Sequence, residues 1–266
     1  MDSESGRFIL PNDMALSWSA ATDIGLKRKE NQDSYLSEPP FFLVADGMGG
    51  NAGGKQASST LLEKLATLKD QSVNLSQVRK YLAAACEDVM GLSEANLDFT
   101  LSPPGTTLTG IIVLGSLDET GSEPLKLMVL NIGDSRTYET HNGVLTQVTH
   151  DHSQVAEMID RGMITPQQAQ MMPNRSVITR AIGAGQTELP VIDTWEFPLQ
   201  AGRRFLICSD GLSSMINDGI IGYNLVSRDT PEQAVRSLVA TALEAGGKDN
   251  VTVIVLDVED AGGNDA

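Results

Sequence analysis

The sequence FFLVADGMGG, from Phe41 to Gly50, joins a short apolar run to Asp46 and a glycine-rich loop. A continuous apolar run of this length is typical of a strand that is buried on both faces. Three further apolar runs adjoin an aspartate in the same way: Arg204–Cys208 before Asp210, Leu127–Ile132 before Asp134, and Val251–Leu256 after Asp249. Each strand would hold one carboxylate at its end, and four such ends at one edge of a sandwich would form an acidic, oxygen-rich pocket.

An Asp-Gly pair is also a common hairpin turn, which is the alternative explanation for these aspartates. A tight hairpin needs a returning strand directly after the turn. Asp46 is followed by a glycine-rich loop and then by a helical pattern from Gly54. Asp210 is followed by Leu212–Met215, which has no clear strand pattern. Both contexts weaken the hairpin interpretation.

Apolar periodicity divides the rest of the chain into strand-like and helix-like segments. The further strand candidates are Leu16–Ala21, Ser34–Leu36, Thr107–Leu114, Leu125–Ile132, Ser135–Glu139, Val191–Phe197 and Val251–Val258. The helix candidates are the segment from Gly54 to Leu68, Leu75–Val89, Ser153–Arg161, Thr165–Met172 and Pro231–Ala245, the last with Thr230 as its N-cap. Strands dominate and the helices come in blocks. This order favours an α+β protein of two packed antiparallel sheets with helices outside.

The composition is that of a folded, acidic protein. Of 266 residues, 41% are hydrophobic, which is enough for a sizeable core, and the formal net charge is -16. This charge disfavours nucleic acid and anionic membranes as partners and suits a cation-binding protein, although acidity for solubility alone is the alternative. Cys86 and Cys208 lack CxxC spacing, so neither a disulfide framework nor a zinc site is expected. A reducing cytoplasm is the expected compartment.

The two ends of the chain carry little apolar periodicity. We expect residues 1–13 and 259–266 to be flexible and residues 14–258 to form a single domain. The first residues lack a basic segment followed by an apolar one, so no signal peptide is expected. The apolar runs have the length of strands and are too short to span a bilayer.

The chemistry of four carboxylates in one pocket favours a binuclear metal site. Carboxylate and water oxygens suit Mg²⁺ or Mn²⁺ better than softer ions. Two such ions about 3.5–4 Å apart can share a hydroxide and orient a phosphate ester for in-line attack. Arg28, in a charged loop, is the candidate to hold the phosphate, because its planar guanidinium matches two phosphate oxygens. The alternative is that Arg28 is a solvated surface residue.

These residues form an ordered pattern that resembles the PPM, or PP2C-type, protein phosphatases, most closely their compact bacterial form. The resemblance covers roughly Trp18 to Leu256. It rests on seven segments in the family's order: Arg28-x-x-Asn31-x-Asp33, Val44–Gly50, Gly105–Thr107, Gly133–Arg136, Asp151–Ser153, Cys208–Leu212 and Asp249–Thr252. Each segment alone is a weak signal, whereas seven in this order are very specific. The resemblance implies a four-layer α-β-β-α sandwich with the metal ions at one end of the sheets.

The resemblance also implies a role for each carboxylate. Asp46 would bridge two core ions, and the carbonyl group of Gly47 would help to hold the second. Asp210 and Asp249 would complete the first. Asp134, together with Asp210, would be placed at a third, weaker ion.

Three further features follow from the same resemblance. Asp33 would bind metal-coordinated water molecules, and Arg28 would bind the phosphate. The stretch from about residue 153 to 182 would be a flap beside the active site that influences substrate choice.

The chain departs from the bacterial pattern at three positions. Asn51 replaces a usual histidine, Lys55 replaces a usual glutamate, and Met172 precedes Pro173 where the flap often has histidine. If the family histidine donates a proton to the leaving group, His152 or a metal-bound water must do so here.

The function expected from these features is metal-dependent hydrolysis of phosphoserine and phosphothreonine in proteins by a metal-bridging hydroxide. The alternatives are a catalytically impaired member that acts as a phosphoprotein-binding module, and a phosphatase of small phosphoesters. The expected partner is a phosphoprotein, in opposition to a serine/threonine kinase, and the expected oligomeric state is a monomer.

Overall fold

Strand β4 (Phe41–Ala45) is buried on both faces in the computed structural model, which describes residues 1–50, 53–69, 73–95, 102–117, 124–172, 176–186 and 188–262. Phe41, Leu43 and Ala45 pack against helices, whereas Phe42 and Val44 point into the space between two sheets. Because successive side chains of a strand point to opposite faces, a continuous apolar run needs an apolar layer on each side. The strand is therefore a central part of a layered structure.

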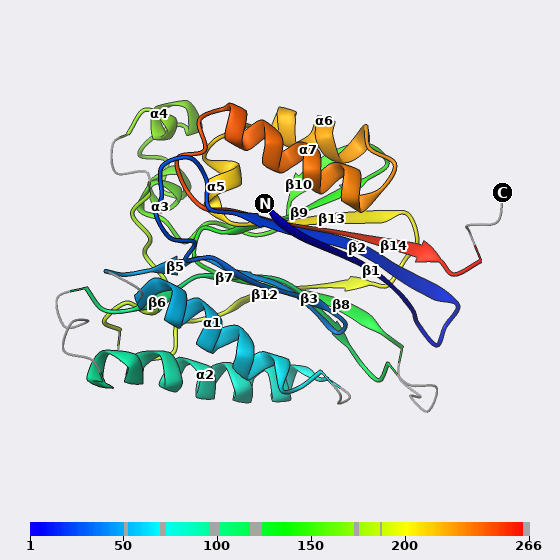
Figure 1. Cartoon of the computed structure of the whole chain (residues 1–266), viewed down its shortest axis with the longest axis horizontal. Coiled ribbons are helices and arrows are strands. Elements are labelled where there is room, and N and C mark those ends of the chain that lie inside the picture. Colours follow the sequence, from blue (N-terminus) through cyan, green and yellow to red (C-terminus); the bar gives the residue numbers. More distant parts are fainter. Residues whose placement is uncertain are drawn as a thin grey trace.

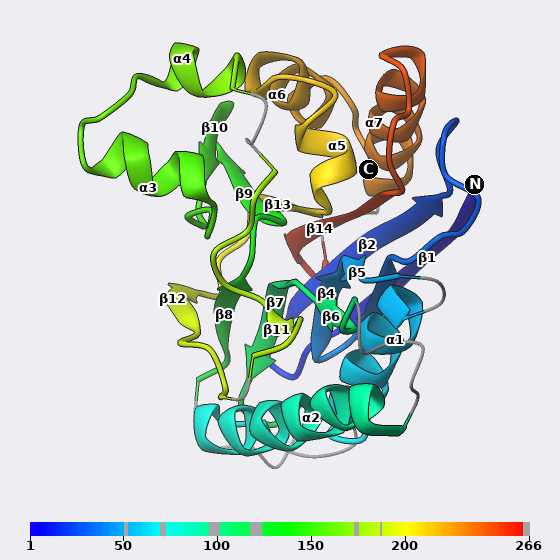
Figure 2. The same ribbon diagram turned by 90° about the vertical axis from the view of Figure 1, so that its left-hand side faces the viewer.

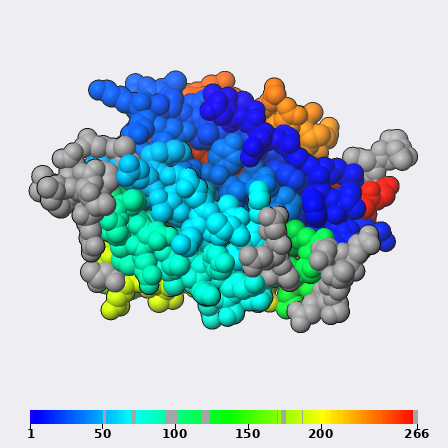
Figure 3. All heavy atoms as spheres, turned by 60° about the horizontal axis from the view of Figure 1, so that its bottom comes forward, coloured from blue at the N-terminus to red at the C-terminus, as the bar shows by residue number. Residues whose placement is uncertain are grey.

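The sheet that contains β4 has five strands in the order β12-β8-β7-β4-β3, and two helices cover its outer face (Figure 1). Its other strands are β3 (Ser34–Glu38), β7 (Leu108–Leu114), β8 (Lys126–Ile132) and β12 (Asp193–Pro198). The helices are α1 (Gly53–Ala66) and α2 (Leu75–Ala95). Leu61 and Leu65 of α1 and Leu82 of α2 are fully buried against the sheet, and the outer surfaces of both helices form the cyan to teal area of the face seen in Figure 3.

The second sheet has six strands in the order β1-β2-β14-β13-β9-β10. They are β1 (Asp2–Ile9), β2 (Met14–Asp23), β9 (Arg136–His141), β10 (Val144–Gln147), β13 (Arg203–Cys208) and β14 (Val251–Asp260). The helices on its side of the molecule are α5 (Asp210–Ser213), α6 (Asp218–Val226) and α7 (Pro231–Glu244). Leu238 of α7 packs with Leu206 and Val253 of the sheet.

The two sheets face each other across a third apolar core, which includes Phe42, Ile111, Phe205 and Ile254. All pairings between named strands are antiparallel. The α-β-β-α arrangement expected from the resemblance, and the two antiparallel sheets expected from periodicity, are confirmed.

One end of the sandwich carries smaller elements that sit beside the strand ends (Figure 2). A short sheet has the order β11-β6-β5, formed by β5 (Gly47–Met48), β6 (Gly105–Thr106) and β11 (Ile182–Gly183). Helices α3 (Gln154–Asp160) and α4 (Pro166–Gln170) project from the same end, between β10 and β11 in the sequence. These two helices occupy the segment expected to be the flap.

The N-terminal segment, which was expected to be flexible, contains strand β1. Residues 2–9 pair with residues 15–22 of β2 along the whole strand. Most side chains of β1 are exposed, so backbone hydrogen bonds hold the strand and its apolar pattern is weak. At the other end, β14 continues through Asp260, beyond the expected domain boundary at residue 258, and the N–H group of Ala261 donates to the carbonyl of Asp13 at 2.8 Å. Residues 263–266 lie outside the described part.

Sequence periodicity did not indicate β10, α6 or the three short strands. In α6, apolar residues occur on all sides, and Ile220, Tyr223 and Val226 are exposed, so the helix lacks a single apolar stripe. Within the described residues, no helix is both long enough and apolar enough to cross a membrane.

Candidate active site

Four aspartates lie together at the end of the sandwich that carries the short strands. A cavity of about 430 Å³ is lined by the carboxylates of Asp46, Asp134, Asp210 and Asp249. Gly47 and Arg28 line the same cavity. The acidic pocket expected from the strand ends is therefore formed, and it contains six of the seven site residues that the sequence suggested.

None of the four aspartates is the tip of a two-strand hairpin. Asp46 lies between β4 and β5, and Asp134 lies between β8 and β9, strands that belong to different sheets. Asp210 begins α5, and Asp249 lies between α7 and β14. The hairpin explanation is thus wrong for all four, because none of these aspartates joins two neighbouring strands of one sheet.

The backbone of Asp46 is fixed by two threonines, Thr106 at the end of β6 and Thr107 directly before β7. Its N–H group donates to Thr107 Oγ1 at 3.0 Å, and its carbonyl accepts from Thr107 N at 2.9 Å and from Thr106 Oγ1 at 3.1 Å. Gly47 follows in a crowded place, where an added Cβ would lie 2.1 Å from the carbonyl oxygen of Gly54. The loop therefore requires glycine directly after the acid.

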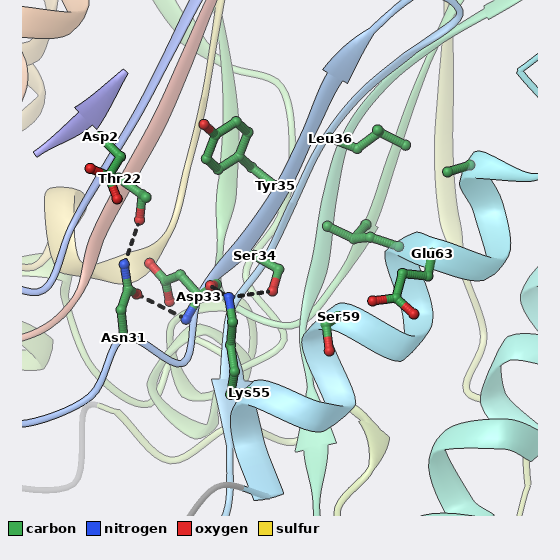
Figure 4. Close-up of a pocket in the computed structure, with 12 residues that line it drawn as sticks. Asp2, Thr22, Asn31, Asp33, Ser34, Tyr35, Leu36, Lys55, Ser59 and Glu63 are labelled. Carbon is green, nitrogen blue, oxygen red and sulfur yellow. Dashed lines mark hydrogen bonds between the residues drawn. The ribbon is translucent and has the colours of Figure 1, made fainter. Parts of the chain in front are cut away.

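Asp33, the seventh of these residues, is 2% exposed and lines a second cavity instead of the acidic pocket. Its Oδ2 accepts from Thr252 Oγ1 at 2.7 Å, whereas its buried Oδ1 has no hydrogen-bond partner among the residues that the structure describes. The Lys55 ammonium donates to the backbone oxygen of Asp33 at 2.7 Å and to Ser34 Oγ at 3.0 Å (Figure 4). Lys55 thus ties the first turn of α1 to the start of β3, beside this second cavity of about 460 Å³.

Burial and mutual repulsion raise the pKa of these carboxyl groups. Burial, with the charge of Asp210 adding to it, raises the pKa of Asp134 to about 8, and burial raises that of Asp33 to about 6. The pKa of Asp46 is well above its usual range, because it is buried and faces Asp33 and Asp210. Burial and the charge of Asp249 raise the pKa of Asp210 in the same direction. A cation in this pocket would stabilise the ionised form of these acids, so the raised pKa values favour a cation-binding site.

Arg28 lies at the mouth of the pocket and contacts one of the acids. Its Nη2 is 2.6 Å from Asp249 Oδ2, and 54% of its side chain is exposed. The Asn250 side chain holds the loop on either side of Arg28, since its Nδ2 donates to the carbonyls of Ile24 at 2.9 Å and Glu30 at 3.0 Å. The guanidinium is therefore placed beside the acids by an ion pair and by a fixed loop.

The residues present fit divalent cations with oxygen ligands. The buried Oδ1 of Asp33 lacks a donor, and the neighbouring acids have raised pKa values that a cation would lower. Within the described residues, no three His, Cys, Asp or Glu side chains are arranged closely enough to form a metal site by themselves. Backbone oxygen and water would have to complete the coordination, as is usual for Mg²⁺.

The segment expected to be the flap reaches the pocket. Ser176 and Ile178 line the cavity together with the aspartates. The two ends of the segment meet where Ser153 and Ile178 form an antiparallel bridge. Asn51, one of the three departures from the bacterial pattern, lies outside the described residues, as does Pro173, which follows the departure at Met172.

His152 does not face the pocket, so its suggested use as a proton donor to the leaving group is not supported. The side chain is 4% exposed. Its Nδ1 accepts from the Gly133 N–H at 3.0 Å, and its Nε2 is 3.0 Å from Asp193 Oδ2. Both ring nitrogens are thus engaged inside the protein.

The supporting roles of Thr107, Asn250 and Thr252 were missed by sequence reasoning. Asn250 and Thr252 lie one and three residues after Asp249, and their amide and hydroxyl groups beside an expected ligand were the available signal. Thr107 lies far from every expected ligand in the sequence, and only its contacts with Asp46 reveal its role.

Comparisons with known proteins identify the family of this chain. Residues 27–251 match the family model described as protein phosphatase 2C. The serine/threonine protein phosphatase PstP of Mycobacterium tuberculosis is 38% identical over 248 residues, which cover 93% of this chain and 46% of that protein. The serine/threonine phosphatase stp of Listeria monocytogenes is 30% identical over 249 residues, which cover 89% of this chain and 93% of that one. This chain thus spans about half the length of the mycobacterial relative.

A solved structure of a related phosphatase has the same fold. The catalytic domain of PstP, determined in complex with two manganese ions, superimposes with a TM-score of 0.80 at 34% identity and covers 93% of this chain and 100% of its own. The chain belongs to the protein phosphatase 2C family.

Proposed function

We propose that this chain hydrolyses phosphoserine and phosphothreonine in proteins, with two Mn²⁺ or Mg²⁺ ions in the acidic pocket and a third, weaker ion beside them. The observation that carries the proposal is the convergence of Asp46, Asp134, Asp210 and Asp249 with Arg28 around one cavity of about 430 Å³. The similarity to serine/threonine phosphatases over nearly the whole chain supports the same reaction.

The ligands would come from rigid elements on both sheets. Asp46 would bridge the core ions, with the Gly47 carbonyl on the second and with Asp210 and Asp249 on the first. Asp134 and Asp210 would hold the weaker ion. When bound, such ions activate water for attack and neutralise charge on the phosphate.

The protein groups around the ions have separate tasks. Asp33 would accept hydrogen bonds from water in the pocket through its free Oδ1. Arg28 would bind the phosphate oxygens from the pocket mouth, where a planar fork fits them better than an ammonium does. The flap residues Ser176 and Ile178 would contact the protein chain on either side of the phosphorylated residue.

The wider setting is part of the same proposal. Residues 14–258 would form one phosphatase domain, to which β1 adds a strand, and the protein would act as a monomer in the cytoplasm. The substrate would be a phosphoprotein made by a serine/threonine kinase. A net charge of -16 argues against nucleic acid and anionic lipid as partners.

A metal titration with a phosphopeptide tests the proposal. Chelator-treated protein should be inactive, and Mn²⁺ or Mg²⁺ should restore turnover. Asp46→Asn and Asp210→Asn should each lower kcat by about 100-fold or more at saturating metal, because each removes ligand charge at the reacting centre. Full turnover without metal, or retained turnover in both variants, would refute the mechanism.

The same experiment separates the alternatives. A chain that binds phosphopeptide but never hydrolyses it would be an impaired, binding member of the family. A chain that hydrolyses small phosphoesters but not phosphopeptides would be a different phosphatase.

A further inference from the structure

The turn that presents Asp134 to the pocket has a backbone conformation that needs external support. Gly133 has a φ of +110°, in a region that L-residues rarely adopt. An added Cβ at this position would lie 2.5 Å from Thr107 Cγ2. The turn is also the point at which the chain passes from one sheet to the other, between β8 and β9.

His152 holds this turn from both sides. Its ring Nδ1 accepts from the Gly133 N–H at 3.0 Å, and its own backbone N–H donates to the Gly133 carbonyl at 2.9 Å. The side chain is 4% exposed, so the ring has little freedom to move. Asp134, the next residue, is 8% exposed and lines the acidic pocket.

The tautomer of the His152 ring follows from the hydrogen bonds of its two nitrogens. An Nδ1 that accepts a hydrogen bond carries no proton, so the neutral ring carries its proton on Nε2. Nε2 lies 3.0 Å from Asp193 Oδ2, which can accept that proton's hydrogen bond. Arg180 Nη1 lies 3.0 Å from Asp193 Oδ1 and 2.9 Å from the ring Nε2. The guanidinium donates to Asp193 and fixes that carboxylate, and since it cannot accept a proton, the Nε2 hydrogen bond goes to Asp193.

The same residue joins the turn to the flap. The carbonyl of His152 accepts from the Thr179 N–H at 2.8 Å. The adjacent residues Ser153 and Ile178 form an antiparallel bridge, and we call the place where these two ends of the flap meet the flap stem. Arg180 follows directly in the chain and also donates to the Val191 carbonyl at 3.1 Å. The flap stem and the Asp134 turn therefore share one support.

We propose that His152 is a positioning residue for Asp134: its Nδ1 fixes the Gly133 turn, while Asp193 accepts from the ring Nε2 and so favours the required tautomer. The consequence for metal binding rests on the proposed function, because it assumes that Asp134 holds the weaker ion. The effect on the turn itself does not depend on that assumption.

Two substitutions at His152 separate its two nitrogens. In His152→Asn the side-chain oxygen is as many bonds from Cβ as Nδ1 is, so it can still accept from Gly133. In His152→Gln the terminal amide reaches the place of Nε2 instead and leaves the Gly133 N–H without its acceptor. Hydrogen exchange of the Gly133 amide, followed by NMR in metal-free protein, should be about tenfold faster in His152→Gln, as expected for one lost hydrogen bond. In His152→Asn it should stay near the wild-type rate.

The ¹⁵N chemical shifts of the His152 ring and the affinity for Mn²⁺ complete the test. The wild-type ¹⁵N spectrum should show a bare Nδ1 and a protonated Nε2. Calorimetry should find the weaker Mn²⁺ site loosened about tenfold or more in His152→Gln, as for other supporting residues of metal ligands, with the two core ions unaffected. Asp193→Asn should shift the ring signals, whereas Asp160→Asn, at the exposed His150–Asp160 pair of 2.8 Å, should leave Gly133 unchanged.

The outcomes are distinguishable. Equal Gly133 exchange in the Gln and Asn variants, or a protonated Nδ1 in the wild type, would overturn the inference. If the buried substitutions prevent folding, Asp193→Asn decides it, because Asp193 is 33% exposed and an unchanged ring tautomer and Gly133 rate would contradict the proposed role. Absence of Mn²⁺ binding in the wild type would instead refute the proposed function.

Discussion

Arg28 and Asp249 form an ion pair of 2.6 Å at the mouth of the acidic pocket, although one is expected to bind phosphate and the other metal. The pair is consistent with both roles. A metal ion on Asp249 would weaken its hold on the guanidinium, and a phosphate would then offer Arg28 two acceptors in place of one. At the scale of single residues, the Arg28–Asp249 ion pair is thus a contact that a phosphate substrate can replace.

Replacement of Arg28 tests its contribution to substrate binding. Arg28→Ala should raise KM for a phosphopeptide by about tenfold or more, as expected for loss of a charge-assisted hydrogen bond. Arg28→Lys should recover only part of the loss, because an ammonium keeps the charge without the planar fork. Steady-state kinetics at saturating Mn²⁺ measures both. Lys27→Ala is a suitable control at an exposed neighbouring cation, and an unchanged KM in Arg28→Ala would remove Arg28 from the substrate site.

At the scale of elements, two helices begin with the same Thr-Pro pair in different surroundings. Thr230 accepts from Gln233 N at the start of α7, and Thr165 accepts from Gln168 N at the start of α4. Helix α7 buries Leu238 and Val239 against the six-stranded sheet, whereas α4 is a five-residue helix of the flap. The same cap therefore supports a core element in one place and a peripheral one in the other.

The two caps should affect stability differently. Thr230→Ala should lower the free energy of unfolding of the whole protein by about 1 kcal/mol, the usual value of such a cap. Thr165→Ala should loosen the flap and leave global unfolding nearly unchanged, because little core depends on α4. Denaturant unfolding measures the first effect, and limited proteolysis within residues 153–182 measures the second. Equal losses of global stability would show that the flap unfolds with the core.

Strand β1 offers a second test at this scale. Gly6 lies against the ring of Trp18, where an added Cβ would be 2.3 Å from Trp18 Cζ2. Removal of residues 1–9 should expose Trp18 and the edge of β2. A loss of about 2 kcal/mol, typical of one large apolar side chain, corresponds to a Tm lower by about 4–8 °C in a protein of this size. Gly6→Val should reproduce part of this loss at full length, and an unchanged Tm after truncation would mean that β1 contributes nothing to stability.

At the scale of the whole molecule, the acidic pocket makes stability depend on pH and on metal. The pKa of Asp134 is raised to about 8 and that of Asp33 to about 6, both from an ordinary value of 3.8. Between the ordinary and the raised values, the folded protein binds more protons than the unfolded chain. The free energy of unfolding therefore falls as pH rises through this range. A bound cation offsets the repulsion among the ionised acids.

Thermal unfolding should show this dependence directly. In the presence of chelator, Tm should fall as pH rises from about 4 to 8, and Mn²⁺ should raise it most at the alkaline end. Asp134→Asn should make the metal-free slope shallower, since the amide carries no charge. A metal-free Tm that rises over the same range would contradict the raised pKa values.

Much of the layered architecture could be predicted from the sequence because it rests on local patterns. Strand β4 was expected at Phe41–Ala45 and occurs there, and α7 was expected at Pro231–Ala245 and ends one residue earlier. Buried strands and amphipathic helices carry their period in their own residues. Strand β1 and helix α6 were missed, since β1 is held by its neighbour's backbone and α6 has no single apolar face.

By itself, the sequence determined which carboxylates stand at the ends of buried strands, because a strand's apolar run and the acid that follows it are neighbours in the chain. It also weakened the interpretation of Asp46 and Asp210 as hairpin turns, since no clear returning strand pattern follows either of them. Only the tertiary structure decided that four aspartates from both sheets surround one cavity, that Arg28 pairs with Asp249, and that His152 faces Gly133 instead of the pocket. These contacts join residues far apart in the sequence, and their geometry depends on how the two sheets pack, which no local pattern encodes.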